Sequence, residues 1–191
     1  LCTGQGKTLA TLIDNKAMAD KYASYDMGQK EFFTFTTGEG VKLNGWLVKP
    51  KDFNPQKKYP VITYQYGGPG SQQVRNAWGI GMSGNGAILE QLMAQQGYIV
   101  ILPNRRGTTA FGQEWKEQIS GDYPGLNMQD YLSAGRYIKG QPYVSKLACV
   151  GASYGGYSAY MLEGLHGDLY DCFIAHAGIF DEKQLWVTTE E

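Results

Sequence analysis

Four short apolar segments alternate with segments of helical periodicity, and this alternation limits the possible folds of the chain most. The apolar segments are rich in β-branched and aromatic residues, as buried strands are, and span residues 60–66, 98–102, 147–150 and 172–177. Between them, apolar residues recur at helical spacing in residues 86–96, 127–138 and 154–165. This order predicts a mainly parallel sheet with right-handed crossovers and helices on both faces.

The helix ends and the first third of the chain carry further local signals. Gly97 is expected to end the first of these helices, and Asn127 to cap the second. Residues 30–50 contain two alternating runs around the turn sequence TGEG, which is typical of a β-hairpin. Residues 7–13 alternate weakly and predict a short strand. Asp14 or Asn15 can then cap a helix that extends through Tyr25.

Composition excludes several classes of function. The 191 residues fit one domain, or one domain with a flank, and contain 17 Lys+Arg against 18 Asp+Glu without a run of like charge. Neither nucleic acid nor an anionic membrane is therefore expected as a partner. The sequence contains no stretch of 18 apolar residues, so no membrane span is predicted. The sequence begins with Leu1 rather than Met and shows no signal peptide, so we expect a processed chain or a fragment.

The cysteines predict neither a disulfide framework nor a metal site. There are three, Cys2, Cys149 and Cys172, at spacings that fit no ligand cluster. Cys149 and Cys172 lie in apolar runs, so both are expected to be buried thiols.

The pentapeptide GASYG at residues 151–155 indicates the chemistry. It fits the nucleophile-elbow pattern G-x-S-x-G, with Ser153 at the centre. In a chain with 26 glycines the letters alone are a weak signal, but an apolar strand ends at the motif and a helix begins after it. Small residues at positions 151, 155 and 156 would permit the strained turn that exposes the Ser153 hydroxyl. A glycine-rich turn without chemistry is the alternative.

The same turn would also favour an oxyanion, because it places the Tyr154 N–H near a helix N-terminus. The loop YGGPG at residues 66–70 follows the first apolar strand, where this fold class supplies the other oxyanion donor. A Tyr66 hydroxyl can donate to an oxyanion directly. The alternative is a tyrosine that is simply buried at the end of a strand.

Arg105 and Arg106 follow the next apolar strand. A guanidinium there can bind a substrate carboxylate or hold loops together. We favour the second interpretation, with a partner such as Asp130.

The two histidines do not complete a catalytic triad. A serine nucleophile needs a histidine base and an acid that orients it, and in α/β-hydrolases both follow the serine on later strands. His166 is expected at the end of the helix after Ser153, and His176 within the next strand, so both are interpreted as structural. We therefore expect this chain alone to show little serine-directed catalysis.

Residues 3–8 (TGQGKT) match only the end of a phosphate-binding loop. The full pattern requires a glycine where this chain has Leu1, and a helix that starts at Lys7. The pair Asp14 and Asn15 interrupts that helix, so nucleotide binding is not expected.

Taken together, these motifs resemble the catalytic domain of the prolyl oligopeptidase family, in its dipeptidyl peptidase branches. The resemblance runs from about Gly6 to the end and is carried by GASYGGY at 151–157, YGGPGSQ at 66–72, NRRGTTAFG at 104–112 and the region 121–123. Residues 6–100 look like bacterial dipeptidyl peptidase IV, and residues from about 103 look like dipeptidyl peptidase V. These branches prefer different residues at the penultimate position of the substrate.

The resemblance implies an α/β-hydrolase fold that is incomplete at the C-terminus. Residues 1–25 would be the end of a β-propeller and a linker helix, and residues 26–191 the N-terminal part of the catalytic domain. The family's acid and base would lie beyond residue 191. No metal or organic cofactor is implied.

The resemblance also implies roles for individual residues. Ser153 would be the nucleophile, and Tyr66 with the Tyr154 N–H would form the oxyanion hole. Tyr154, Phe180 and Trp186 would line the substrate pocket. The expected substrate is an oligopeptide that loses N-terminal dipeptides. A homodimer of the full-length protein and a periplasmic or secreted location are implied as well.

Two alternative functions stay open at this point. A carboxylesterase or lipase on the same fold would carry a His-Gly-Gly loop where this chain has Tyr66, and turnover of a short ester against a dipeptide amide would separate the two. A truncated domain that only binds partners is favoured by the missing acid and base. An Asp followed by a His in sequence beyond Glu191 would exclude it.

Overall fold

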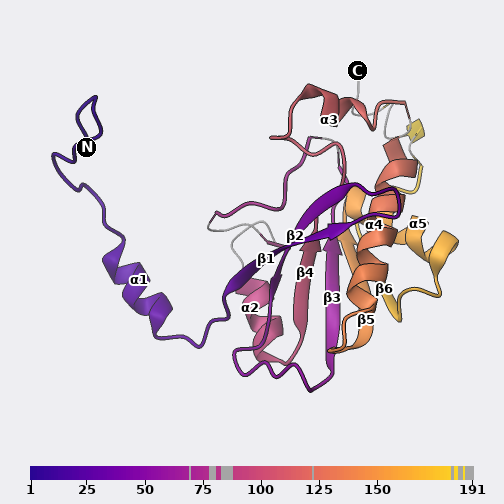
Figure 1. Cartoon of the computed structure of the whole chain (residues 1–191), viewed down its shortest axis with the longest axis horizontal. Coiled ribbons are helices and arrows are strands. Elements are labelled where there is room, and N and C mark those ends of the chain that lie inside the picture. Colours follow the sequence, from indigo (N-terminus) through magenta and orange to yellow (C-terminus); the bar gives the residue numbers. More distant parts are fainter. Residues whose placement is uncertain are drawn as a thin grey trace.

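The computed structural model describes residues 1–68, 70–77, 81–82, 88–121, 123–181, 183–184 and 187, and all these side chains except those of residues 123 and 124. Within this part of the chain, six strands form one sheet in the order β1-β2-β4-β3-β5-β6 (Figure 1). The strands are β1 (Lys30–Thr36), β2 (Lys42–Val48), β3 (Tyr59–Gln65), β4 (Ile99–Pro103), β5 (Val144–Ala152) and β6 (Cys172–His176).

The sheet is mainly parallel, as predicted. β4, β3, β5 and β6 run in the same direction, and β2 joins β4 in antiparallel pairing as part of the β1–β2 hairpin. Ile62 of β3 pairs with Val100 on one side and Ala148 on the other, so the apolar β3 lies in the middle of the sheet. The four parallel strands end at one edge, where ligands bind in open α/β sheets.

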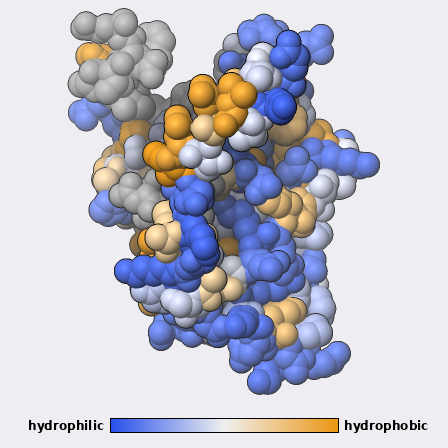
Figure 2. Space-filling view, turned by 90° about the vertical axis from the view of Figure 1, so that its left-hand side faces the viewer, coloured by the Kyte–Doolittle hydropathy of each residue, from blue (hydrophilic) through white to orange (hydrophobic). Residues whose placement is uncertain are grey.

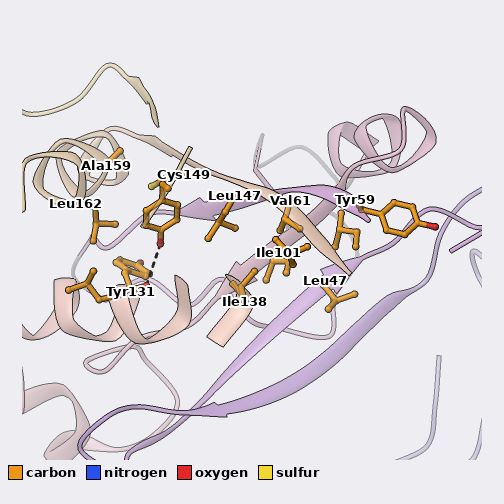
Figure 3. Close-up of a cluster of buried hydrophobic side chains, with 14 of the residues drawn as sticks. Leu47, Tyr59, Val61, Ile101, Tyr131, Ile138, Leu147, Cys149, Ala159 and Leu162 are labelled. Carbon is orange, nitrogen blue, oxygen red and sulfur yellow. Dashed lines mark hydrogen bonds between the residues drawn. The ribbon is translucent and has the colours of Figure 1, made fainter. Parts of the chain in front are cut away.

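Helices cover both faces of the sheet, also as predicted. Successive residues of β4 point to opposite faces, so Val100 and Leu102 pack with α2 (Ile88–Gln95), and Ile99 and Ile101 face the other side. α4 (Tyr123–Lys139) and α5 (Tyr154–His166) cover that second side. Figure 3 shows their side chains pointing at β3 and β5; the labelled ones are Tyr131, Ile138, Ala159 and Leu162, against Val61, Leu147 and Cys149. Burying each large apolar side chain here contributes about 1.5–3 kcal/mol.

The N-terminal segment stands away from the sheet (Figure 1). α1 (Lys16–Ala23) has no buried residue, and the exposed fractions of Leu12 and Ile13 are 77% and 80%. The face of the molecule that carries this segment is mostly hydrophilic, with a group of hydrophobic residues in its upper part (Figure 2). No helix among the described residues has both the length and the apolar character that crossing a bilayer requires.

The predicted strand at residues 7–13 is wrong. Only an isolated bridge between Cys2 and Thr8 forms, because residues 9–13 find no ladder partner within the described part of the chain. The helix after it is confirmed. Its N-cap is Asn15, but the side chain of Asp14 accepts the Lys16 N–H at 3.0 Å.

The ends of the other helices were predicted with mixed success. α2 ends as expected: Gly97 has a φ of +88°, and the Tyr98 N–H reaches back to the Met93 carbonyl at 3.0 Å. Residues 86 and 87 of the predicted helix lie outside the described residues. α4 begins at Tyr123, so Asn127 is buried inside the helix and does not cap it. Pro124 in the first turn accounts for the earlier start, since proline suits that position.

Two further features differ from the sequence interpretation. A short helix, α3 (Gln113–Glu117), was not predicted. Cys149 is a buried thiol as expected, whereas Cys172 is exposed. The reason is position in the sheet: among the described strands β6 is an edge, so its side chains alternate between half-buried and exposed.

Candidate active site

Ser153 lies in a sharp turn between β5 and α5. Its φ of 57° and ψ of −120° form a strained conformation for a residue with a side chain, and its side chain is exposed. The Ser153 N–H donates to the His176 carbonyl at 2.9 Å, and the Ser153 carbonyl accepts from the N–H groups of Gly156 and Tyr157 at 2.9 and 3.2 Å. The backbone is therefore held on both sides of the turn, which keeps the serine in this strained state.

Three glycines let the neighbouring backbones approach this turn. A Cβ on Gly155 would lie 2.9 Å from the Cα of Tyr66, and one on Gly151 would lie 2.9 Å from the Gln65 carbonyl oxygen. A Cβ on Gly156 would lie 2.6 Å from the Cα of Gly178. These approaches are too close for any side chain, so the predicted need for small residues at 151, 155 and 156 is confirmed.

The loop of residues 66–68, here called the Tyr66 loop, packs directly on the start of α5. Gly67 has a φ of +79°, and a Cβ on it would lie 2.7 Å from Ser158 Oγ and 3.5 Å from the Tyr154 ring. The Tyr66 ring is half-buried and folds over Gly68, where an added Cβ would lie 3.0 Å from the Tyr66 hydroxyl oxygen. The fold thus brings the Tyr66 loop and the Ser153 turn together, although 87 positions separate residues 66 and 153.

Arg105 reaches the Tyr66 loop from the end of β4. Its guanidinium is 1% exposed and donates from Nη2 to the Gly68 carbonyl and from Nη1 to the Arg106 carbonyl at 2.8 Å. The Ser71 hydroxyl donates to the same Gly68 carbonyl at 2.8 Å. The Tyr66 loop is therefore fixed from outside as well as by its contact with α5.

Arg106 joins three elements through an ion pair with Asp130 of α4. Arg106 Nη2 lies 2.9 Å from Asp130 Oδ1, and the Arg106 N–H donates to Oδ2 at 2.7 Å. Arg106 Nη1 also lies 2.6 Å from Glu39 in the turn of the β1–β2 hairpin. Burial raises the pKa of Asp130, and the hydrogen bonds and charge of Arg106 oppose that shift. The interpretation of Arg106 as a loop tether through Asp130 is confirmed.

The predicted pocket residues do not share one environment. The Tyr154 side chain is only 6% exposed, beside the Tyr157 ring at 5.3 Å. Phe180 is 81% exposed and stacks on Tyr160 at 4.8 Å. Trp186 lies outside the described residues. A pocket formed by all three therefore stays a prediction.

Neither histidine bonds the Ser153 hydroxyl. His166 ends α5 as expected, and His176 is the exposed last residue of β6, where its backbone carbonyl holds the serine N–H. Among the described residues, no group of three or more His, Cys, Asp or Glu side chains could hold a metal ion. Within the described part of the chain, the turn therefore presents an exposed hydroxyl to which neither histidine is bound.

Sequence reasoning missed two contributors to this site. Arg105 was considered only together with Arg106, yet its guanidinium contacts the Tyr66 loop and that of Arg106 does not. The position directly after an apolar strand was the one available signal. The role of His176 could not be predicted from the sequence, because its backbone carbonyl, and not its side chain, accepts the Ser153 N–H.

Comparisons with known proteins agree with one another. Residues 88–191 match the profile of the prolyl oligopeptidase family. A dipeptidyl-peptidase 5 of Porphyromonas gingivalis is 44% identical over 188 residues, which are 97% of this chain and 26% of that protein. A dipeptidyl-peptidase 5 of Porphyromonas endodontalis is 46% identical over 165 residues, 85% of this chain and 23% of that protein. This chain therefore spans about a quarter of the length of these relatives.

Solved structures show the same relationship. The crystal structure of Porphyromonas gingivalis dipeptidyl peptidase 4 superposes with a TM-score of 0.84 at 34% identity, covering 94% of this chain and 25% of that one. A putative dipeptidyl aminopeptidase IV from Bacteroides ovatus gives a TM-score of 0.76 at 29% identity, and the match covers 84% of this chain and 22% of that one. The α/β-hydrolase fold is thereby shown. The long match to dipeptidyl-peptidase 5 also includes most of residues 6–100, which resemble the peptidase IV branch by sequence.

Proposed function

Because this chain belongs to the prolyl oligopeptidase family, we propose that it supplies the nucleophile and the oxyanion hole of a serine peptidase that removes dipeptides from oligopeptide N-termini. One observation supports this most: the exposed Ser153 in its strained turn, directly beside the Tyr66 loop. Such strain in a residue with a side chain is typical of functional sites.

The proposed chemistry assigns one step to each group. Ser153 Oγ attacks the scissile carbonyl, and the resulting oxyanion accepts hydrogen bonds from the Tyr154 N–H and the Tyr66 hydroxyl. Each such donor contributes about 2.7–4 kcal/mol to transition-state stabilisation. The Ser153 proton passes to a histidine base oriented by an acid. We propose that this histidine and this acid lie outside the described residues.

We further propose that residues 1–25 connect this domain to another, and that residues 26–191 form the first part of the catalytic domain. The absence of buried residues in α1 supports a connector. A homodimer also stays a prediction, and sedimentation of the complete gene product tests it.

Labelling with a fluorophosphonate probe tests the nucleophile. In the complete gene product, Ser153→Ala should abolish labelling. Ser145→Ala is the matched control, because Ser145 is exposed on β5, the strand that leads to the Ser153 turn, and it should leave labelling unchanged. Equal labelling of the Ser153→Ala variant would show that another residue is the nucleophile.

Turnover measurements test the substrate class. A dipeptide amide with a free N-terminus should be cleaved, and its N-acetylated form should not. Tyr66→Phe should lower kcat for the amide by about 10²–10³ with little change in KM. Rapid turnover of a short ester together with no cleavage of the amide would instead identify a carboxylesterase.

A further inference from the structure

We propose that Arg105 is a positioning residue for the oxyanion hole: its guanidinium holds the Tyr66 loop so that the Tyr66 hydroxyl is correctly placed. This inference rests on the proposed function, because it assigns a role within the same site. Arg105 itself contacts neither the substrate nor the reacting atoms in this proposal.

The partners of Arg105 are unusual for a buried cation. Among the described residues its guanidinium bonds to the carbonyls of Gly68 and Arg106, with Ser71 Oγ at 3.5 Å, and none of these groups is charged. A buried charge without a counter-ion stabilises a fold less than an apolar side chain of similar size. General stability therefore does not explain an arginine at this position.

Two contacts hold the Tyr66 loop. Arg105 holds the Gly68 carbonyl, and the Tyr66 ring folds over that glycine. On the other side the buried Tyr131 ring packs on Gly67, where an added Cβ would lie 3.6 Å from Cε2 of Tyr131. Burial raises the pKa of Tyr131, and the charge of Arg105 opposes that shift. The guanidinium and the Tyr131 ring therefore hold the loop from two sides.

The contacts of Arg105 depend on the planar, forked shape of the guanidinium. Its two terminal nitrogens bond to carbonyls from different loops in fixed directions. A lysine would keep the charge but lose the fork. Misplacement of a catalytic group by about 1 Å can cost on the order of 10²-fold in rate.

Arg106 provides a matched control. It lies in the same loop and is also buried, but its side chain bonds to Asp130 and Glu39. Arg106→Lys should therefore disturb the loop and lower the melting temperature without a selective effect on the oxyanion hole.

The test compares Arg105→Lys with Arg106→Lys in the complete gene product. For Arg105→Lys, kcat on the dipeptide amide should fall about 10–100-fold while KM changes less than about twofold. For Arg106→Lys, kcat should stay within about threefold of wild type. An unchanged kcat for Arg105→Lys, or an equal loss in both variants, would overturn the proposal.

A double variant separates positioning from general destabilisation. If Arg105 acts through Tyr66, Arg105→Lys should lower kcat no further in a Tyr66→Phe background. If the losses in kcat of the two single variants multiply in the double variant, Arg105 does not act through Tyr66. Should Arg105→Lys fail to fold, Ser71→Ala removes the other donor to the Gly68 carbonyl and should show the same dependence on Tyr66. Activity in Ser153→Ala would reject the proposed function itself. Loss of activity in Ser153→Ala and Tyr66→Phe, with a normal Arg105→Lys, would reject only this inference.

Discussion

Gly155 is the residue at which the active-site turn tolerates least change. Its neighbours are the carbonyl of Gln65, the last residue of the central strand β3, and the Cα of Tyr66, the first residue of the Tyr66 loop; both are backbone atoms that cannot move aside. We expect Gly155→Ala to destabilise the protein by about 1–3 kcal/mol through overpacking, and to separate Ser153 from the Tyr66 loop. Urea denaturation measures the first effect, and the rate of fluorophosphonate labelling measures the second.

Gly164, in the same helix, is the matched control for this prediction. A Cβ added there meets nothing within 4 Å. Gly164→Ala should therefore stabilise the protein by about 0.5–1 kcal/mol and leave labelling unchanged. Wild-type labelling in Gly155→Ala would mean that the close approach at Gly155 is not required.

At the scale of elements, the two ion pairs of Arg106 join α4, the loop after β4 and the β1–β2 hairpin. Asp130 is completely buried, so removing its carboxylate leaves the Arg106 guanidinium with only the half-exposed Glu39. We expect Asp130→Ala to lower the free energy of unfolding by about 3–5 kcal/mol. Glu39→Ala, at the exposed end of the same network, should cost about 1 kcal/mol or less. Equal costs in a denaturation experiment would refute this ranking.

Most elements could be predicted because local composition and tertiary environment agree in them. The apolar runs of β3 and β4 lie in the centre of the sheet, where burial on both faces matches their composition. The predictions failed where burial or strand pairing depends on the position of a segment in the fold. Cys172 lies in an apolar run but on the edge of the sheet, and residues 7–13 alternate but lack a partner strand.

The site was predictable to a similar degree. The turn at Ser153 and the loop at Tyr66 each leave a local signature of glycines next to a strand. Arg105 leaves only its position after an apolar strand, because its contact with Gly68 is one that no spacing in the sequence reveals. Phe180 and Trp186 rest on family resemblance, and their roles stay predictions.

For the molecule as a whole, the N-terminal segment and the sheet should differ in resistance to proteolysis. Lys16 and Lys21 lie in α1, which has no buried residue, so brief trypsin treatment should cut there first. Lys146 is also an exposed residue, but its backbone lies in the β5 ladder opposite Pro60 and should be protected. Mass spectrometry of the fragments distinguishes the sites. Protection of Lys16 and Lys21 would show that α1 packs against another surface.

The bond between the Ser153 N–H and the His176 carbonyl has a consequence during protein synthesis. A ribosome adds residue 153 well before residues 176 and 178, so the nascent serine lacks both this acceptor and the glycine on which Gly156 packs. Its strained backbone, which costs about 1–3 kcal/mol, becomes favourable only once β6 has joined β5. The Ser153 turn therefore takes its strained form only after residues 176 to 178 have been added and β6 has paired with β5.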